Sequence, residues 1–181
     1  MQSSRDSVRL TRRQFVTAGA IGGAALAVGC SSRNHGSWDF LSDGQALTLA
    51  ALCDRIVPAD DFPSASQAGT ITYIDRQLAR TYRRYRNAYR DGLEQADAIS
   101  RKRFGRDLAA ISAAQQVEIA GAIEQQNRKF FDLVRGHALE GYYGSPRHGG
   151  NRDAASWRML GLAEPPVLGR AQYDLRKGPA R

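Results

Sequence analysis

Apolar residues recur at helical spacing through the middle of the chain. Between Ile74 and Ala96 they follow one another at intervals of three or four residues, whereas a strand would need alternation at every second position. This pattern predicts one long helix over about 71–104. Arginines occupy its other faces. The apolar positions are Ile74, Leu78, Tyr82, Tyr85, Tyr89, Leu93 and Ala96.

Two short signatures mark the beginnings of further helices. In each, a serine is followed three residues later by a glutamine, the capping-box spacing in which each side chain bonds the other residue's backbone N–H. The pairs are Ser42 with Gln45 and Ser112 with Gln115. The first helix is expected to stop at Pro58, because proline disfavours helical backbone in the residue before it. The side chains expected to face the core are Leu49, Leu52, Cys53 and Ile56 in the first helix and Val117, Ala120 and Ile123 in the second.

The remaining pattern completes an all-α fold. Phe130, Phe131, Val134 and Ala138 predict another helix over about 128–139, and residues 58–69 have loop composition. Residues 141–153 hold four glycines and a proline, so they are expected to be non-helical. We therefore predict a small bundle of four or five helices over 42–161, with a Gly-rich C-terminal loop and an extended tail at 162–181.

The first thirty residues have the features of an export signal. A basic stretch precedes a weakly apolar run at 18–28, which is far shorter than the roughly 20 residues of a membrane span. The segment around Arg12, Arg13 and Phe15 resembles the twin-arginine signal, which a receptor reads. Residues 26–30 also resemble a lipobox, in which Cys30 is acylated; the alternative is ordinary signal cleavage with Cys30 left unmodified. Residues 31–41 then form a tether.

Charge and cysteine content exclude several functions. The formal net charge of the chain is +8, but residues after the signal carry 22 basic and 17 acidic side chains, so nucleic-acid binding is not expected. Two cysteines cannot by themselves build a disulfide framework, a four-ligand zinc site or an iron–sulfur cluster. Nucleotide-binding glycine motifs are also missing from the sequence. No catalytic, cofactor-binding or metal-binding residue is therefore predicted in this chain.

Three segments together resemble a known family. They are residues 52–61, residues 73–75 and residues 141–153 with Trp157, within a resemblance that covers about 45–161. The chain is similar to the gluconate 2-dehydrogenase subunit 3 family, the small subunit of membrane-bound flavin-dependent sugar and sugar-acid dehydrogenases. His148 stands where an aromatic residue usually precedes Gly-Gly-Asn in that family.

The resemblance implies a subunit that does not catalyse alone. FAD would lie in a large GMC-type dehydrogenase subunit, and a cytochrome c subunit would accept electrons in some complexes. The small subunit would bring the flavoprotein to the twin-arginine translocase and help to hold it at the membrane through a lipid anchor, on the periplasmic side. The alternative is a stand-alone helical envelope lipoprotein that acts as a scaffold.

Several residues have two interpretations before the fold is known. The aromatic residues of the C-terminal loop either pack on the bundle or contact a partner, and Cys53 is either a buried thiol or a bridge to a partner. Asp60 and Asp61 are expected to cap the loop rather than to catalyse. The arginines at 83, 84, 86 and 90 either face solvent or meet anionic lipid or an acidic partner. The partner-interface candidates are Tyr142, Tyr143, His148, Asn151, Trp157 and Cys53.

Overall fold

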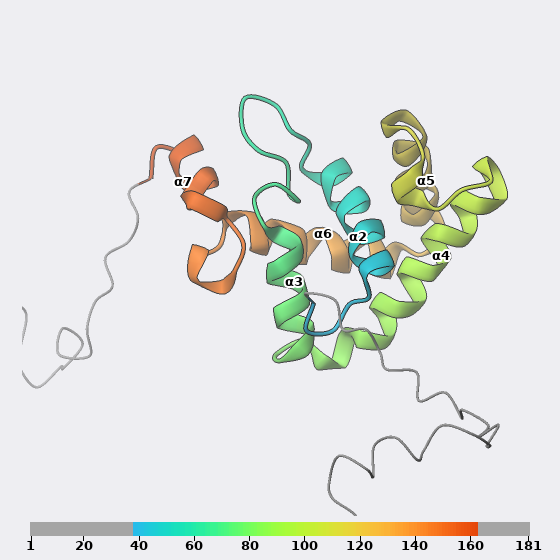
Figure 1. The fold of residues 1–181 in the computed structure, drawn as a ribbon, viewed down its shortest axis with the longest axis horizontal. Coiled ribbons are helices and arrows are strands. Elements are labelled where there is room, and N and C mark those ends of the chain that lie inside the picture. The colour runs from blue at the N-terminus through green and yellow to red at the C-terminus, as the bar shows by residue number, and fades with distance from the viewer. Residues whose placement is uncertain (1–37, 163–181) are drawn as a thin grey trace, which may run out of the picture. The chain divides into compact units, whose positions relative to one another are not determined.

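The computed structural model describes residues 38–162, and these residues form a helical domain (Figure 1). Six α-helices and no strand occur within this range, so the predicted all-α class is confirmed. The predicted export signal at Arg12, Arg13 and Phe15 lies outside the described residues, as do Cys30 and the tail from residue 163. The helices are α2 (Asp43–Ile56), α3 (Thr70–Ala79), α4 (Arg86–Phe104), α5 (Ala113–Gln126), α6 (Arg128–Tyr143) and α7 (Ala155–Met159). Short 3₁₀ helices are η1 (Arg83–Tyr85), η2 (Leu108–Ala110), η3 (Pro146–His148) and η4 (Arg152–Ala154).

Both predicted capping boxes are present. The Ser42 hydroxyl accepts the N–H of Gln45 at 3.2 Å, and the Gln45 side chain accepts the N–H of Ser42 at 3.1 Å. The same reciprocal pair joins Ser112 and Gln115 at the start of α5. Helix α2 ends at Ile56, two residues before Pro58. These boundaries agree with the sequence because a cap depends only on residues within one turn.

The predicted long helix over 71–104 is wrong, because the chain turns between Ala79 and Arg86. The Arg86 side chain satisfies carbonyl groups at the end of α3: its Nε donates to Leu78 at 2.8 Å and its Nη2 to Ala79 at 3.1 Å. Leu78 and Tyr89, on either side of the turn, are both fully buried. The apolar spacing runs on through the turn because both helices face one core, so periodicity alone does not reveal the break.

One further helix boundary and one buried helix face differ from the prediction. Helix α6 continues through Tyr143, so residues 141–143 are helical despite their composition. A Cβ on Gly141 would lie 2.8 Å from Cδ1 of Tyr73, so this glycine allows α3 and α6 to approach closely rather than ending a helix. On α5, Val117 is 57% exposed and Ile119 is the buried residue instead. Tertiary packing decides which side of a helix faces the core, and the spacing of apolar residues in the sequence does not reveal that side.

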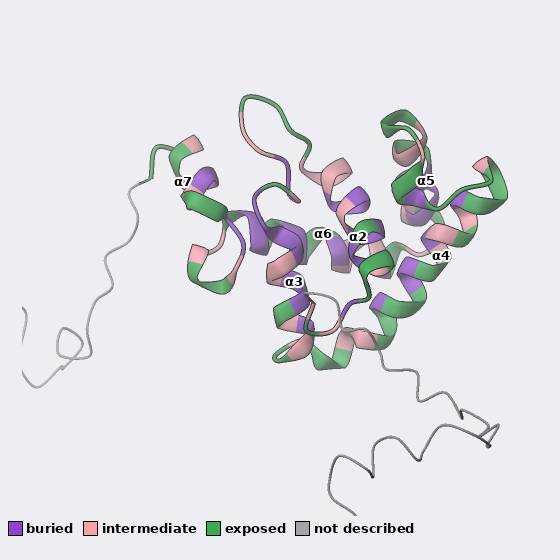
Figure 2. Ribbon diagram, in the orientation of Figure 1, coloured by how far each residue is buried: buried purple, intermediate pink, exposed green. Residues whose placement is uncertain are grey.

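Helix α2 lies against α3, α4, α5 and α6, and the core forms where they face one another (Figures 1 and 2). The burial pattern in Figure 2 follows one side of each of these helices. None of the helices in residues 38–162 combines the length and apolarity needed to cross a membrane. The largest fully buried apolar side chains include Leu49, Ile74, Leu78, Tyr89, Leu93, Ile119, Ile123, Val134 and Tyr142.

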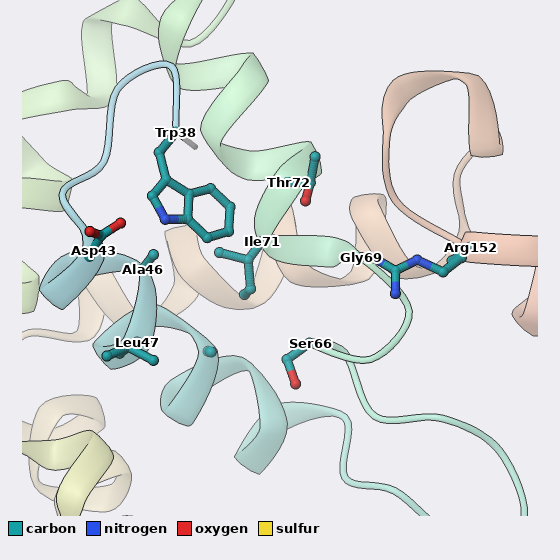
Figure 3. Close-up of a pocket in the computed structure, with 10 residues that line it drawn as sticks. Trp38, Asp43, Ala46, Leu47, Ser66, Gly69, Ile71, Thr72 and Arg152 are labelled. Carbon is teal, nitrogen blue, oxygen red and sulfur yellow. The ribbon is translucent and has the colours of Figure 1, made fainter. Parts of the chain in front are cut away.

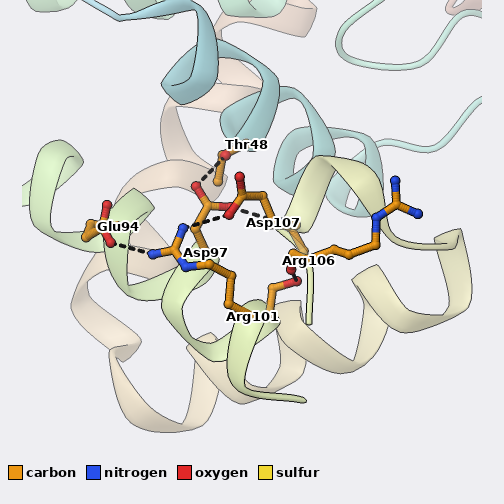
Figure 4. A network of polar contacts seen from close by, with 8 residues as sticks. Thr48, Glu94, Asp97, Arg101, Arg106 and Asp107 are labelled. Carbon is orange, nitrogen blue, oxygen red and sulfur yellow. Dashed lines mark hydrogen bonds and ion pairs between the residues drawn. The ribbon is translucent and has the colours of Figure 1, made fainter. Parts of the chain in front are cut away.

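A polar network joins α2, α4 and η2 at one end of the bundle (Figure 4). Asp97 accepts the Thr48 hydroxyl at 2.8 Å and the backbone N–H of Leu108 at 2.9 Å. Nearby, Arg101 pairs with Glu94 and with Asp107, each at 2.6 Å. The Arg101 pairs are exposed and add little to stability, whereas Asp97 satisfies the buried Thr48 and positions the turn after α4.

Candidate functional site

The loop after α2 and the Gly-rich segment meet at the C-terminal end of α6. The Tyr142 hydroxyl donates to the Pro63 carbonyl at 2.8 Å, and the backbone N–H of Arg152 donates to Ala68 at 2.8 Å. These bonds join the loop after α2 to the Gly-rich loop after α6. We call residues 57–69 together with 141–153 the C-terminal junction. It is a single packed unit built from segments about eighty residues apart in sequence.

Glycine is required at the centre of the junction. A Cβ on Gly150 would overlap the carbonyl oxygen of Gly141, which is backbone and has little room to move. Gly149 has φ +99°, in the left-handed region that favours glycine, and a Cβ there would lie 2.7 Å from the guanidinium of Arg76. The Gly-Gly pair therefore serves close backbone packing. This use differs from a phosphate-binding loop, because the space beside Gly150 is filled by α6.

Asn151 completes the junction from the inside. Its side chain is fully buried, its Nδ2 donates to the Gly144 carbonyl at 2.9 Å, and its Oδ1 accepts the backbone N–H of Ser156 at 2.9 Å. Its φ of +44° lies in the left-handed region, which asparagine tolerates better than most residues. Asn151 thus connects the end of α6 to the start of α7, and its side chain has no surface to offer a partner.

Tyr142 and Cys53 also take interior positions. Tyr142 is 2% exposed and is bonded to Pro63, so of its two interpretations the core role holds. Cys53 is a free, fully buried cysteine, and burial, with a smaller effect of Asp54, raises the pKa of its thiol well above the usual range. A buried thiol that resists ionisation is a poor nucleophile for disulfide exchange. The structure therefore favours the structural-thiol interpretation.

Acidic residues of the motif segments hold backbone rather than a substrate. Asp75 is 3% exposed, and its carboxylate accepts the backbone N–H groups of Asp39 at 2.7 Å and of Phe40 and Leu41 at 2.9 Å. Asp60 accepts the N–H of Phe62 at 2.8 Å, which is the predicted local cap. In the same way Asp54 accepts the N–H and hydroxyl of Ser66. These carboxylates fix the course of the loops around α2.

Three of the candidates remain at the surface. His148 is exposed, Tyr143 is 40% exposed, and Trp157 is half-buried with its indole N–H donating to the Tyr143 carbonyl at 2.8 Å. Leu139 lies one turn before Tyr143 on α6, and the N–H of Leu162 donates to the Trp157 carbonyl at 2.8 Å. The exposed apolar and aromatic residues here form what we call the C-terminal apolar surface, made of Leu139, Tyr143, Trp157, Leu160 and Leu162.

A pocket of about 350 Å³ opens beside the junction, between the beginnings of α2 and α3 (Figure 3). Figure 3 shows the Trp38 ring beside Ile71, with Leu47 across from them on α2. Arg152 of the junction reaches its edge, and Leu47 is 61% exposed. A volume of this size is at the lower end of the range for small-molecule sites. The lining is mostly apolar, which suits insertion of side chains from another protein.

The comparison with protein families decides the identity of this helical domain. The model of gluconate 2-dehydrogenase subunit 3 matches residues 43–163, a range that contains every helix of the structure and the whole junction. The chain belongs to the gluconate 2-dehydrogenase subunit 3 family. No curated protein and no solved structure matched it. Family membership places the chain among the subunits of a flavin-dependent dehydrogenase complex.

Within this subunit 3 domain, one polar cluster was missed by sequence reasoning. The His137 ring stacks on Tyr82 at 4.2 Å between centroids, and its Nδ1 lies 3.0 Å from the Tyr89 hydroxyl. Glu140, on the next turn of α6, accepts the hydroxyls of Tyr82 at 2.6 Å and Tyr73 at 3.2 Å. Burial lowers the pKa of His137 and raises the pKa of Tyr89, so both are held neutral. The cluster joins α3, α4 and α6.

The signals that would have found these residues are weak. Asp75 directly follows Ile74 in the predicted apolar stripe, and His137 adjoins Ala138 on α6. A polar residue next to a buried position is commonplace, and only the fold shows that its partners are backbone groups or tyrosines. Among the residues that the subunit 3 structure describes, no three His, Cys, Asp or Glu side chains are grouped as metal ligands would be.

Proposed function

We propose that this chain is the non-catalytic small subunit of an exported, FAD-dependent dehydrogenase of the gluconate type, and that it binds the GMC-type flavoprotein through the C-terminal apolar surface. The observation that carries the proposal is the family match over 43–163, which spans all six helices. A match confined to one helix pair would support the fold only. A match across the junction supports the subunit role as well.

The geometry of the junction supports a protein interface. Tyr143 is an exposed aromatic residue, and Trp157 is a half-buried one. Both belong to a backbone that Asn151 and Gly150 hold in place. Large aromatic residues on a rigid support lose little conformational entropy on binding and are common at the centres of interfaces. The pocket beside Arg152 would extend this surface towards α2.

The proposal also assigns a role to the residues before the helical domain. Arg12, Arg13 and Phe15 would direct the chain to the twin-arginine translocase, which exports folded cargo, and the flavoprotein would leave the cytoplasm bound to it. Acylation of Cys30 would then hold the complex at the periplasmic face of the membrane. A cytochrome c subunit would accept electrons from the flavin where the complex contains one.

Co-purification tests the subunit role directly. The full chain, tagged at its C-terminus, is purified from membranes in mild detergent, and the sample is examined for flavin absorbance and sugar-dependent dye reduction. A large flavoprotein that co-purifies and reduces dye supports the proposal and identifies the substrate. Recovery of the chain alone, without flavin, contradicts it and favours the scaffold lipoprotein.

Export is tested with two matched double variants. Arg12→Lys with Arg13→Lys alters the twin-arginine pair, whereas Arg5→Lys with Arg9→Lys makes the same chemical change outside it. We expect the first variant to leave both this chain and the flavoprotein in the cytoplasm, and the second to export both. Normal export of the flavoprotein in the first variant would contradict the escort role.

A further inference from the structure

Five arginines and no acidic residue occupy the turn between α3 and α4. We call residues 80–90 the arginine turn; it includes η1 and the first turn of α4. Nothing in the subunit role described above uses this segment. Its arginines are Arg80, Arg83, Arg84, Arg86 and Arg90.

Only part of this charge has a structural use. Arg83 donates from Nε to the Ala79 carbonyl at 3.1 Å, and Arg86 donates to the last carbonyls of α3. Arg80, Arg84 and Arg90 are exposed, and within residues 38–162 none of them forms an ion pair. Ion pairs do form elsewhere on the domain, on Arg101, Arg128 and Arg135. The arginine turn therefore presents several guanidinium groups that form no ion pair within the described residues.

The chain reaches the helical domain beside this turn. The guanidinium groups of Arg86 and Arg90 lie over the Phe40 ring, at 5.0 and 5.2 Å from its centroid. Asp75 holds the backbone of Phe40 in place, so the chain passes the arginines at Phe40. Cys30 precedes Trp38 by only eight residues, and an extended chain of that length spans at most about 28 Å. An acyl group on Cys30 would keep the turn near the bilayer.

We infer that the arginine turn binds the anionic headgroups of the membrane and acts as a second membrane contact beside the acyl anchor. This inference rests on the membrane tethering in the proposed function. A basic patch is one of the second signals that strengthen the hold of a lipid anchor on the membrane. Guanidinium groups bind phosphate through paired hydrogen bonds, and the charge on each adds to the attraction by an anionic leaflet.

The position of the turn favours lipid over an acidic protein partner. Figure 1 shows α7 at the upper left of the helical domain and the α3–α4 turn at its lower edge, so a flavoprotein bound at α7 need not cover the turn. Tyr82 and Tyr85 lie half-buried among the arginines, and the Arg84 guanidinium stands 4.6 Å from the Tyr85 centroid. Tyrosine with basic residues is the usual composition of a membrane–water boundary.

Vesicle binding by the full chain tests the inference. Cys30→Ser is introduced in every protein, so that no acyl group contributes and residues 1–37 are otherwise common to all. The probes are vesicles of phosphatidylcholine alone and vesicles in which about a third of the lipid is phosphatidylglycerol. The test variant is R80Q/R84Q/R90Q, which spares Arg83 and Arg86 because they bond backbone carbonyls. Its partition to anionic vesicles should fall about a hundredfold.

Two control variants separate charge from folding and from position. K102Q/R103Q/R106Q removes the same charge from exposed residues at the other end of α4, and should change partition by less than about threefold. R80K/R84K/R90K keeps the charge and should bind nearly as the parent does. The inference is overturned if both Gln variants lose vesicle affinity equally. It is also overturned if binding does not depend on the phosphatidylglycerol content of the vesicles.

The outcomes also separate this inference from the proposed function. If the test variant keeps its vesicle affinity but loses the flavoprotein, the turn faces an acidic protein and the lipid assignment is wrong. If vesicle binding falls as expected and no flavoprotein is ever recovered, the subunit role fails while the membrane face stands. Thermal unfolding of all variants verifies that the helical domain is folded in each.

Discussion

The two ends of α3 differ in whether polar groups are buried beside them. At its start, beside the C-terminal junction, polar groups such as Asn151 and the Tyr142 hydroxyl point inward, while Tyr143 is exposed. At its end, in the arginine turn, Leu78 and Tyr89 are buried and the charges face outward. The turn places an excess of charge at the surface, whereas the junction also buries polar groups and leaves the Tyr143 ring exposed.

This difference indicates what each region is built to contact. A junction that buries amide and hydroxyl groups must satisfy each of them, and this demand holds its backbone rigidly. The apolar residues left outside are then displayed on a stable support, as a protein interface needs. The turn has no such constraint, because guanidinium groups on flexible side chains act through charge over several ångströms. Shape therefore matters at the junction and charge at the turn.

Gly150→Ala tests most directly whether the junction is rigid, and it has the largest expected effect. The added methyl group would overlap the Gly141 carbonyl oxygen, and we expect a loss of at least about 3 kcal/mol in the free energy of unfolding. Denaturant unfolding followed by circular dichroism measures it. Gly136→Ala on α6 is the matched control, since nothing lies within 4 Å of its Cβ; it should stabilise by up to about 1 kcal/mol. Equal effects would show that the junction is not rigid.

Asp75→Asn tests how firmly the segment beside the arginine turn is held. The carboxylate accepts three backbone N–H groups, and an amide offers one oxygen while its NH₂ faces the remaining donor. We expect a loss of about 2–3 kcal/mol, because bonds to a charged acceptor are stronger than neutral ones. Asp60→Asn, with one exposed local bond, should cost less than about 1 kcal/mol. A similar cost in both would contradict the structural role of Asp75.

Tyr143→Ala tests whether the C-terminal apolar surface binds the flavoprotein. The side chain is 40% exposed, so stability should change little, while affinity for the flavoprotein should fall about 30-fold if it is an interface centre. Surface plasmon resonance with the purified flavoprotein measures the change. Val117→Ala removes a comparably exposed apolar residue from α5 and should leave affinity unaltered. The reverse result would move the interface to α5.

The smallest expected effect is a pH dependence of stability from His137. Burial lowers its pKa in the folded state below the unfolded value of 6.5, so the unfolded chain takes up the proton first. Stability should therefore decrease as pH falls through 6.5 and level off below the folded pKa. His137→Gln should flatten this slope in thermal unfolding measured across that range.

The sequence could predict what depends on near neighbours. Capping boxes, the stop before Pro58 and the local cap by Asp60 each involve residues within one turn, and all are present in the structure. The prediction failed where a residue serves a distant one. Gly141 was interpreted as a loop residue, yet its missing side chain makes room for Tyr73 on α3. Composition cannot distinguish a glycine that ends a helix from one that lets two helices meet.

In the candidate site, too, residues that are neighbours in sequence take different positions in the fold. Tyr142 and Tyr143 are equivalent in sequence, but successive residues of a helix point about 100° apart, so one enters the core and the other reaches the surface. Similarly, Asn151 was expected beside Trp157 at an interface and instead bonds Gly144 inside the junction. Which of the two tyrosines faces outward depends on how α6 is rotated against α3.

By itself, then, the sequence determined the helical class, the capped starts of α2 and α5 and the resemblance to the subunit 3 family, which the match over 43–163 bears out. These features depend on residue order and on contacts between residues within one helical turn, which can form without any distant segment. Only the tertiary structure decided that the helix predicted over 71–104 turns at Arg86, that Asp75 is buried beneath the incoming segment and that Gly150 meets α6. Those outcomes follow from excluded volume and the pairing of buried polar groups, which exist only after distant segments have packed together.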